Sequence, residues 1–184
     1  MKRHFLFLLS AIIIIFQTVT AQAGQSVIRI LHVNDFHGFA EPYKPYGSDE
    51  MLGGVSFLAA EVERLRKEKP TLLLAAGDMI QGTNWANMFL GESVIELMNE
   101  MRFDAMVLGN HEFDFGPDVL RKRISQAGFP VLGANIEGLE MVMPYAVREI
   151  YGVKIALIGV VTEDVPVTKK KKNVAGLKFE PPAD

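Results

Sequence analysis

Short apolar segments alternate with amphipathic ones along most of this chain, and this alternation restricts the fold more than any other feature. Ser26–Val33 and Thr71–Ala75 are apolar, partly β-branched runs typical of buried strands. Gly53–Lys67, Ser93–Met101 and Pro117–Ala127 carry apolar residues at helical spacing. Further strands are expected at Ala105–Leu108, Val131–Ala134, Tyr145–Ile150 and Lys154–Val161. Strands that are separated by helices need crossover connections, so the pattern predicts an α/β fold with a mostly parallel sheet flanked by helices.

Residues 1–23 have the features of a secretory signal peptide. Two basic residues precede the apolar run Phe5–Phe16, and Ala21 and Ala23 place small residues at the −3 and −1 positions of a cleavage site. An uncleaved membrane anchor is the alternative, but 12 residues are short for a span, which needs about 20. We therefore expect cleavage after Ala23, no stable membrane span afterwards, and export, most simply to a bacterial periplasm.

Composition excludes several chemistries. The chain has no Cys, which rules out thiolate nucleophiles, Cys-ligated zinc and iron–sulfur clusters. The formal net charge is −3 and becomes −5 once residues 1–23 are removed, so a nucleic acid polymer is not an expected partner. Lys169–Lys172 is expected to be a solvated run of charge in a loop. The sequence favours no particular oligomeric state.

Unusual polar residues follow each of the first three expected strands. Any one of these groups would be an ordinary turn, because Gly, Asn and Asp favour turns. Turn chemistry does not explain two histidines that arrive at the same edge of a sheet, where open α/β folds bind their ligands. The residues concerned are Asn34, Asp35 and His37 after the first strand, Gly77 and Asp78 after the second, and Gly109, Asn110, His111, Glu112 and Asp114 after the third.

These residue types suit a site for two cations. Asp35 and His37 are two positions apart and can project the same way to hold one ion with an oxygen and a nitrogen. Asp78 has two carboxylate oxygens and can bridge two ions. Asn110 offers a neutral carbonyl oxygen to the second ion. Zinc, manganese and cobalt suit such mixed ligands about equally, so the metal stays open.

His111 and Asp114 can act beside such a site without binding metal. His111 is free to serve as an acid or base, and Asp114 lies three residues further on, within reach to orient the imidazole. Glu112 is expected to be structural or to support the metal ligands indirectly. His32 lies inside the first strand, where a packed or backbone-bonded histidine is expected.

Six strings in this order resemble the 5′-nucleotidase family of metallophosphoesterases. The strings are ILHVNDFHG, GGVSFLAAEVERLR, LLLAAGDMIQGT, FDAMVLGNHEFDFG, FPVLGANI and KIALIGVVT. The resemblance implies a calcineurin-like catalytic domain, of which residues 24–184 would be the N-terminal portion. Residues 169–184 are expected to be loop-like, with neither a closing helix nor a polar tail, as if the chain stopped inside a truncated domain.

The resemblance also implies roles for the residues and a reaction. Asp35, His37 and Asp78 would bind the first metal, Asp78 and Asn110 the second, and His111 and Asp114 would be the catalytic pair. The family hydrolyses phosphate esters of nucleotides, including cyclic nucleotides and nucleotide-sugars. In that mechanism a metal-held hydroxide attacks phosphorus in line with the leaving oxygen.

The sequence departs from the family in one respect that keeps an alternative open. The family completes its metal site with later Gly-His and Gly-His-x-His motifs, and this sequence has no histidine after His111. The chain is therefore expected to be part of an exported phosphoesterase or, alternatively, a non-catalytic remnant that cannot complete the site. A metal-binding module without catalysis is disfavoured, because it would not need His111 and Asp114.

Overall fold

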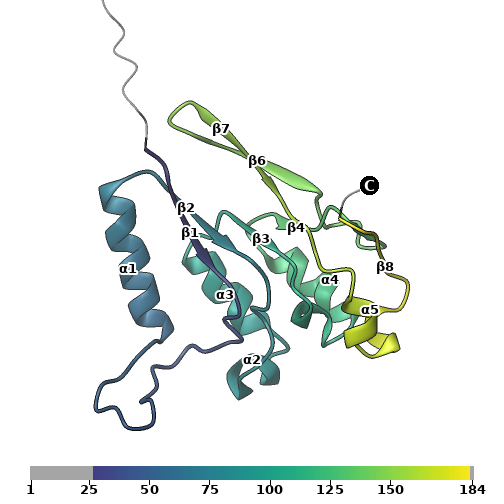
Figure 1. Cartoon of the computed structure of the whole chain (residues 1–184), viewed down its shortest axis with the longest axis horizontal. Helices are drawn as coiled ribbons and strands as arrows, with labels where there is room; N and C mark the ends of the chain where they lie inside the picture. The colour runs from purple at the N-terminus through teal and green to yellow at the C-terminus, as the bar shows by residue number, and fades with distance from the viewer. Residues whose placement is uncertain (1–26, 183–184) are drawn as a thin grey trace, which may run out of the picture.

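The computed structural model describes residues 27–182, so the expected signal peptide lies outside the described residues. Figure 1 shows how the elements are arranged. The strands are β1 (Arg29–Val33), β2 (Thr71–Ala75), β3 (Ala105–Val107), β4 (Val131–Leu132), β5 (Ile136–Glu137), β6 (Tyr145–Ile150), β7 (Val153–Ile158) and β8 (Lys178–Phe179). The helices are α1 (Val55–Glu68), α2 (Asn84–Met88), α3 (Glu92–Glu100), α4 (Pro117–Gln126) and α5 (Val165–Thr168), and 3₁₀ turns lie at His111–Phe113 and Lys171–Val174.

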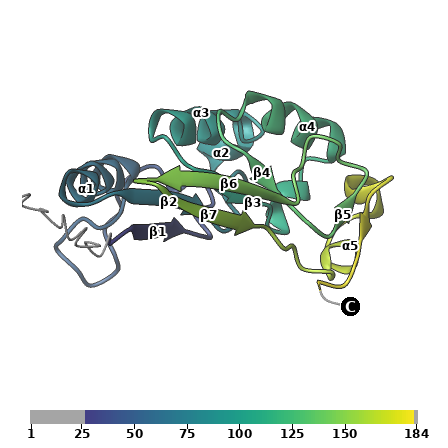
Figure 2. The same cartoon turned by 90° about the horizontal axis from the view of Figure 1, so that it is seen from above.

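The central sheet is parallel and follows chain order, β1-β2-β3-β4. Arg29 pairs with Thr71 and Val33 with Ala75, so the carboxyl ends of β1 and β2 lie level with each other. Each connection leads from one strand to its next neighbour in the same direction across the sheet. Because such connections share one handedness, their helices lie on the same face of the sheet. Figure 2 shows α3 and α4 together above the strands. The predicted α/β class with a mostly parallel sheet is confirmed.

The main core lies between this helical face and the sheet. Each of the three longer helices buries an apolar stripe against the strands, as their helical spacing predicts. The stripes come from Val62 of α1, Val94, Ile95 and Met98 of α3, and Leu120 and Ile124 of α4, and they meet Leu73, Ala75 and Met106 of the strands.

The opposite face of the sheet is only partly covered. The antiparallel hairpin β6–β7 packs there through Ala146 and Leu157 against side chains of β2, β3 and β4. On β1 the outward-facing Ile30 is 55% exposed, and His32 is exposed as well. The expectation of a packed His32 is therefore wrong, since its side chain alternates onto the uncovered face of the first strand.

The chain after residue 160 contains more regular structure than expected. Residues 169–184 include the 3₁₀ turn at Lys171–Val174 and strand β8, which pairs antiparallel with β5. Within residues 27–182, none of the helices combines the length and the apolarity that a bilayer crossing requires.

Candidate metal centre and its histidine–aspartate pair

The predicted site residues meet at the carboxyl edge of the parallel sheet. Asp35 follows β1, Asp78 follows β2, and Asn110 follows β3, each within three residues of the end of its strand. The first two loops are joined by backbone hydrogen bonds, because Asp35 N donates to Gly77 O at 3.1 Å and His37 N donates to Asp78 O at 3.0 Å. The order of the strands thus brings together residues that lie far apart in the sequence.

Three of the four predicted metal ligands have a left-handed backbone. The φ angles are 53° at Asp35, 48° at His37 and 57° at Asp78. Residues other than glycine adopt this conformation rarely, and strain of this kind is concentrated at functional sites. The backbone bonds between the two loops hold these residues in place.

Two glycines let the second and third loops touch. A Cβ atom on Gly77 would lie 2.6 Å from Gly109 N, and a Cβ atom on Gly109 would lie 2.3 Å from Asp78 Oδ1. Both distances are far inside van der Waals contact, so a side chain at either position would push the loops apart. Asp78 and Asn110 can therefore be neighbours only because the backbone is bare at these two residues.

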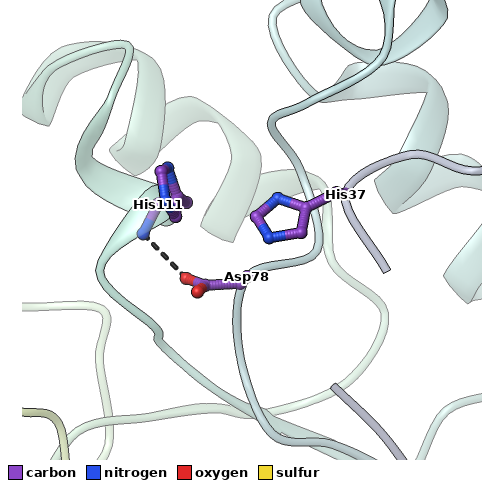
Figure 3. A group of neighbouring side chains, drawn as sticks. All are labelled: His37, Asp78 and His111. Carbon is purple, nitrogen blue, oxygen red and sulfur yellow. Dashed lines mark hydrogen bonds between the residues drawn. The ribbon is translucent and has the colours of Figure 1, made fainter. Parts of the chain in front are cut away.

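His37, Asp78 and His111 form the centre of the site (Figure 3). Each offers one ligand atom, and these three atoms lie within 4.8 Å of one another. His37 Nδ1 lies 2.8 Å from the carbonyl oxygen of Gln81. A carbonyl oxygen only accepts, so Nδ1 carries the proton and Nε2 keeps its lone pair for a cation. Sequence patterns did not indicate this role for Gln81, because the contact is made by the backbone and leaves no side-chain signal.

Asp35 lies at the rim of this group. Its Oδ1 is 3.9 Å from His37 Nε2, and its side chain is 60% exposed. The other carboxylate oxygen of Asp35 accepts a hydrogen bond from the Asn34 amide. Asp78 is more tightly held, since its Oδ1 accepts from His111 N at 2.8 Å.

The Asn110 amide shows that the donor set fits a cation. In one orientation its nitrogen donates to Asp78 Oδ2 and its oxygen accepts from Lys169 Nζ, both at 3.1 Å. In the reversed orientation the amide oxygen faces Asp78 Oδ2, and two oxygens that face each other without a proton repel. A divalent cation between the two oxygens removes that repulsion, so Asp78 and Asn110 fit a metal in the reversed orientation.

His111 is held by Asp114 and by a residue that the sequence did not indicate. His111 Nδ1 lies 2.6 Å from Asp114 Oδ2, as the spacing predicted. Lys169 Nζ lies 2.8 Å from Asp114 Oδ1 and 3.1 Å from His111 Nδ1. The Lys169 side chain is 7% exposed, so the expectation of a solvated run is wrong for this lysine. No local pattern separates Lys169 from the three lysines that follow it.

Glu112 joins the loops that follow β2 and β3. It is 1% exposed, and its carboxylate accepts hydrogen bonds from four backbone N–H groups, those of Asp78, Met79, Ile80 and Gly109. Burial raises the pKa of Glu112, and the backbone donors act against that rise. The carboxylate therefore fixes the turn that carries Asp78 to the turn that carries Asn110.

A polar hollow of about 600 Å³ opens beside His111 and Asp114. Amide and ammonium groups dominate its lining, which includes Gln81, Asn87, Lys169, Lys170 and Asn173. Such a surface suits an anionic or strongly polar ligand next to the histidine.

The family model of the calcineurin-like phosphoesterases matches residues 28–170, which is most of the chain and includes every residue of the site. The chain belongs to this family. It is 38% identical over 164 residues to a snake venom 5′-nucleotidase of Crotalus adamanteus, and 35% identical over 159 residues to a 5′-nucleotidase of Homo sapiens. These matches cover 81% and 78% of this chain, and 28% of each relative.

Solved structures agree with this assignment. A 5′-nucleotidase precursor from Thermus thermophilus superposes with a TM-score of 0.76 at 33% identity, over 83% of this chain and 32% of that one. The NAD nucleotidase of Haemophilus influenzae gives a TM-score of 0.71 at 34% identity, over 83% and 29%. This calcineurin-like phosphoesterase chain thus spans about three-tenths of the length of the proteins it resembles.

Proposed function

We propose that this chain supplies part of the active site of an exported phosphoesterase that hydrolyses nucleotide phosphate esters with two divalent metal ions. The observation that carries the proposal is the convergence of three strand ends on one group of carboxylate, imidazole and amide ligands. The similarity to 5′-nucleotidases of animals and bacteria supports the substrate class. The signal-like sequence of residues 1–23 supports export.

The residues divide into two roles. Asp35, His37 and Asp78 would hold the first cation, and Asp78 and Asn110 the second. Two bound cations would neutralise charge on a phosphate ester and polarise its phosphorus–oxygen bonds. Four protein ligands leave positions on both ions for water, for phosphate oxygens or for further side chains.

His111 and Asp114 would handle the proton of the leaving group. Because His111 Nδ1 lies 2.6 Å from Asp114 Oδ2, the other ring nitrogen, Nε2, is the one that would meet a substrate. From there His111 can hold a hydrogen bond to a phosphate oxygen or give a proton to the leaving alcohol. Asp114 keeps the ring in this orientation through its contact with Nδ1.

Hydrolysis of AMP, of 2′,3′-cyclic AMP and of a UDP-sugar by the protein expressed from its complete gene tests this function. With Mn²⁺ we expect phosphate release from at least one substrate. Replacement of the proton donor, His111→Ala, should lower kcat by about a hundredfold or more. The control Asp118→Asn alters a carboxylate that is almost fully exposed, and it should leave kcat unchanged. Absence of hydrolysis with all three substrates, or kcat unaffected by His111→Ala, would contradict the proposal.

A non-catalytic remnant is the second candidate, and one observation favours it. Apolar side chains around β1 are uncovered: Ile30, Phe39 and Phe57 are each more than half exposed. Phe39 and Phe57 border a hollow of about 790 Å³ whose lining is mostly apolar. A chain with such a surface can be a poorly stable product that binds metal weakly.

A further inference from the structure

The Lys169 ammonium lies beside Asn110, the residue proposed to bind the second divalent cation. Its side chain is more than nine-tenths buried, and its Nζ contacts Asp114 Oδ1, His111 Nδ1 and, in one amide orientation, Asn110 Oδ1. We infer that the Lys169 ammonium is a built-in cation that competes with the second divalent ion for Asn110. This inference rests on the proposed function.

The Asn110 amide cannot serve both cations. When its oxygen accepts from Lys169, its nitrogen faces Asp78 Oδ2 and occupies the position through which a metal would bind. When the amide reverses to present its oxygen beside Asp78, its nitrogen faces the ammonium, and two groups that only donate then oppose each other. Occupation of the second metal position therefore requires Lys169 to withdraw.

The structure provides a place for the ammonium to go. Lys169 lines the polar hollow beside His111, together with Asn87, Thr168 and Asn173, whose side-chain oxygens can accept from it. The backbone around Lys169 need not move, because Asn173 Nδ2 donates to the backbone oxygen of Asp114 at 2.7 Å and anchors this segment. Rotation of a flexible side chain is enough for the exchange.

Movement of the Lys169 ammonium into the hollow would also place a positive charge beside the space in which an anionic ligand would bind. An ammonium in the hollow would face any anionic group that lies beyond His111, whereas 2.8 Å from Asp114 Oδ1 its charge is paired. Binding of the second ion and readiness for an anionic ligand are thereby coupled through one side chain. This coupling predicts that removal of the Lys169 charge strengthens the binding of the second metal ion, and that change in affinity can be measured.

Titration of the full chain with Mn²⁺ alone, followed by electron paramagnetic resonance and calorimetry, tests the inference. We expect two ions per chain, with the second bound more weakly. Lys169→Met keeps the length of the side chain and removes its charge, so the second ion should bind roughly tenfold more tightly, since a unit charge a few ångströms from a divalent ion repels it by at least this factor. Affinity for the first ion should rise by a smaller factor than affinity for the second, because Asn110 does not hold the first ion.

Two further variants make the result decisive. Lys169→Gln retains a donor for Asp114 and should also strengthen the second binding step, so it replaces Lys169→Met if that variant does not fold. Lys171→Met removes an exposed charge from the same run, outside the hollow, and should leave both affinities within about twofold.

The contrary outcomes separate the two proposals. If Lys169→Met and Lys169→Gln bind the second ion as weakly as the unaltered chain or more weakly, the competition is refuted while the metal site stands. If neither the unaltered chain nor any of the variants binds Mn²⁺, both the inference and the proposed metal-dependent function are refuted.

Discussion

Glu112 is the residue on which the geometry of the site most depends, although it touches neither metal nor substrate in the proposed function. Its two oxygens accept from the backbone of the Asp78 turn and from Gly109. The Glu112 carboxylate accepts four backbone hydrogen bonds and is 1% exposed. Water therefore cannot reach these four N–H groups to take its place. The turns after β2 and β3 are therefore held together through one side chain.

Glu112→Gln is expected to lower the free energy of unfolding by about 3 kcal/mol. The amide group places an N–H₂ donor against backbone N–H groups, so about two hydrogen bonds are lost and buried donors stay unsatisfied. Urea unfolding followed by circular dichroism measures the loss. The exposed Glu140→Gln should change stability by less than about 0.5 kcal/mol. A loss below about 1 kcal/mol for Glu112→Gln would mean that the carboxylate does not bind the two turns.

The sequence predicts which candidate residues lie together where their position follows from the order of the strands. Asp35, Asp78 and Asn110 could be grouped because parallel strands end at a common edge. Lys169 could not be added, because it joins the group through a loop whose path depends on the whole fold. His32 failed for a related reason: alternation puts it on one face of β1, but the sequence does not say which segments cover that face.

At the scale of elements, α3 and α4 are joined by a network around a buried guanidinium. Arg123 of α4 is 4% exposed and lies 2.9 Å from Glu92 of α3. Gln126 Nε2 donates to the other oxygen of Glu92 at 2.6 Å. The hydrogen bonds from Gln126 and Arg123 lower the pKa of Glu92 below its usual value of 4.5.

This network predicts how stability depends on pH. Because the pKa of Glu92 is lower in the folded chain, its contribution is present above pH 4.5 and is lost as the pH falls through the folded value. Glu92→Gln should lower the urea midpoint at pH 7, and the difference from the unaltered chain should shrink as the pH falls below 4.5. Unfolding curves at several pH values measure it. The exposed Glu96→Gln on the same helix should show no such difference, and a difference for Glu92→Gln that is constant with pH would contradict the assignment.

The three longer helices could be predicted from the sequence, whereas the two shortest helices could not. α1, α3 and α4 each present an apolar stripe over several turns, which a window of sequence detects. α2 has five residues and α5 has four, too few for a period to show. α2 owes its start to Thr83, whose side chain accepts from Ala86 N. The β6–β7 hairpin turns at Tyr151 and Gly152, which both have positive φ, but its packing partners depend on tertiary structure.

At the scale of the whole molecule, the uncovered apolar face around β1 bears on which of the two proposed functions holds. The relatives are more than three times as long as the segment they share with this chain. A chain that folds cooperatively and binds metal in its native state belongs to the phosphoesterase interpretation, whereas the remnant interpretation predicts partial unfolding.

Thermal unfolding with and without Mn²⁺ distinguishes them. If the native chain binds the ion, Mn²⁺ at about a hundred times its dissociation constant should add about 2.7 kcal/mol of stability and raise the midpoint of a single sharp transition. Asp78→Asn should abolish most of this rise, because it weakens the ligand shared by both ions. A broad transition, strong binding of a hydrophobic dye and no response to Mn²⁺ would favour the remnant.

The match between strand order and chain order has a consequence for how the molecule is made. In a sheet that runs β1-β2-β3-β4, each new strand pairs with the edge formed by the strand before it. A polypeptide that emerges N-terminus first, from a ribosome or through an export channel, can therefore add strands one at a time without reopening any pair. Asp35, Asp78 and Asn110 arrive in that sequence. Lys169 follows all three in the chain, so during synthesis these proposed metal ligands can come together before their internal competitor is made.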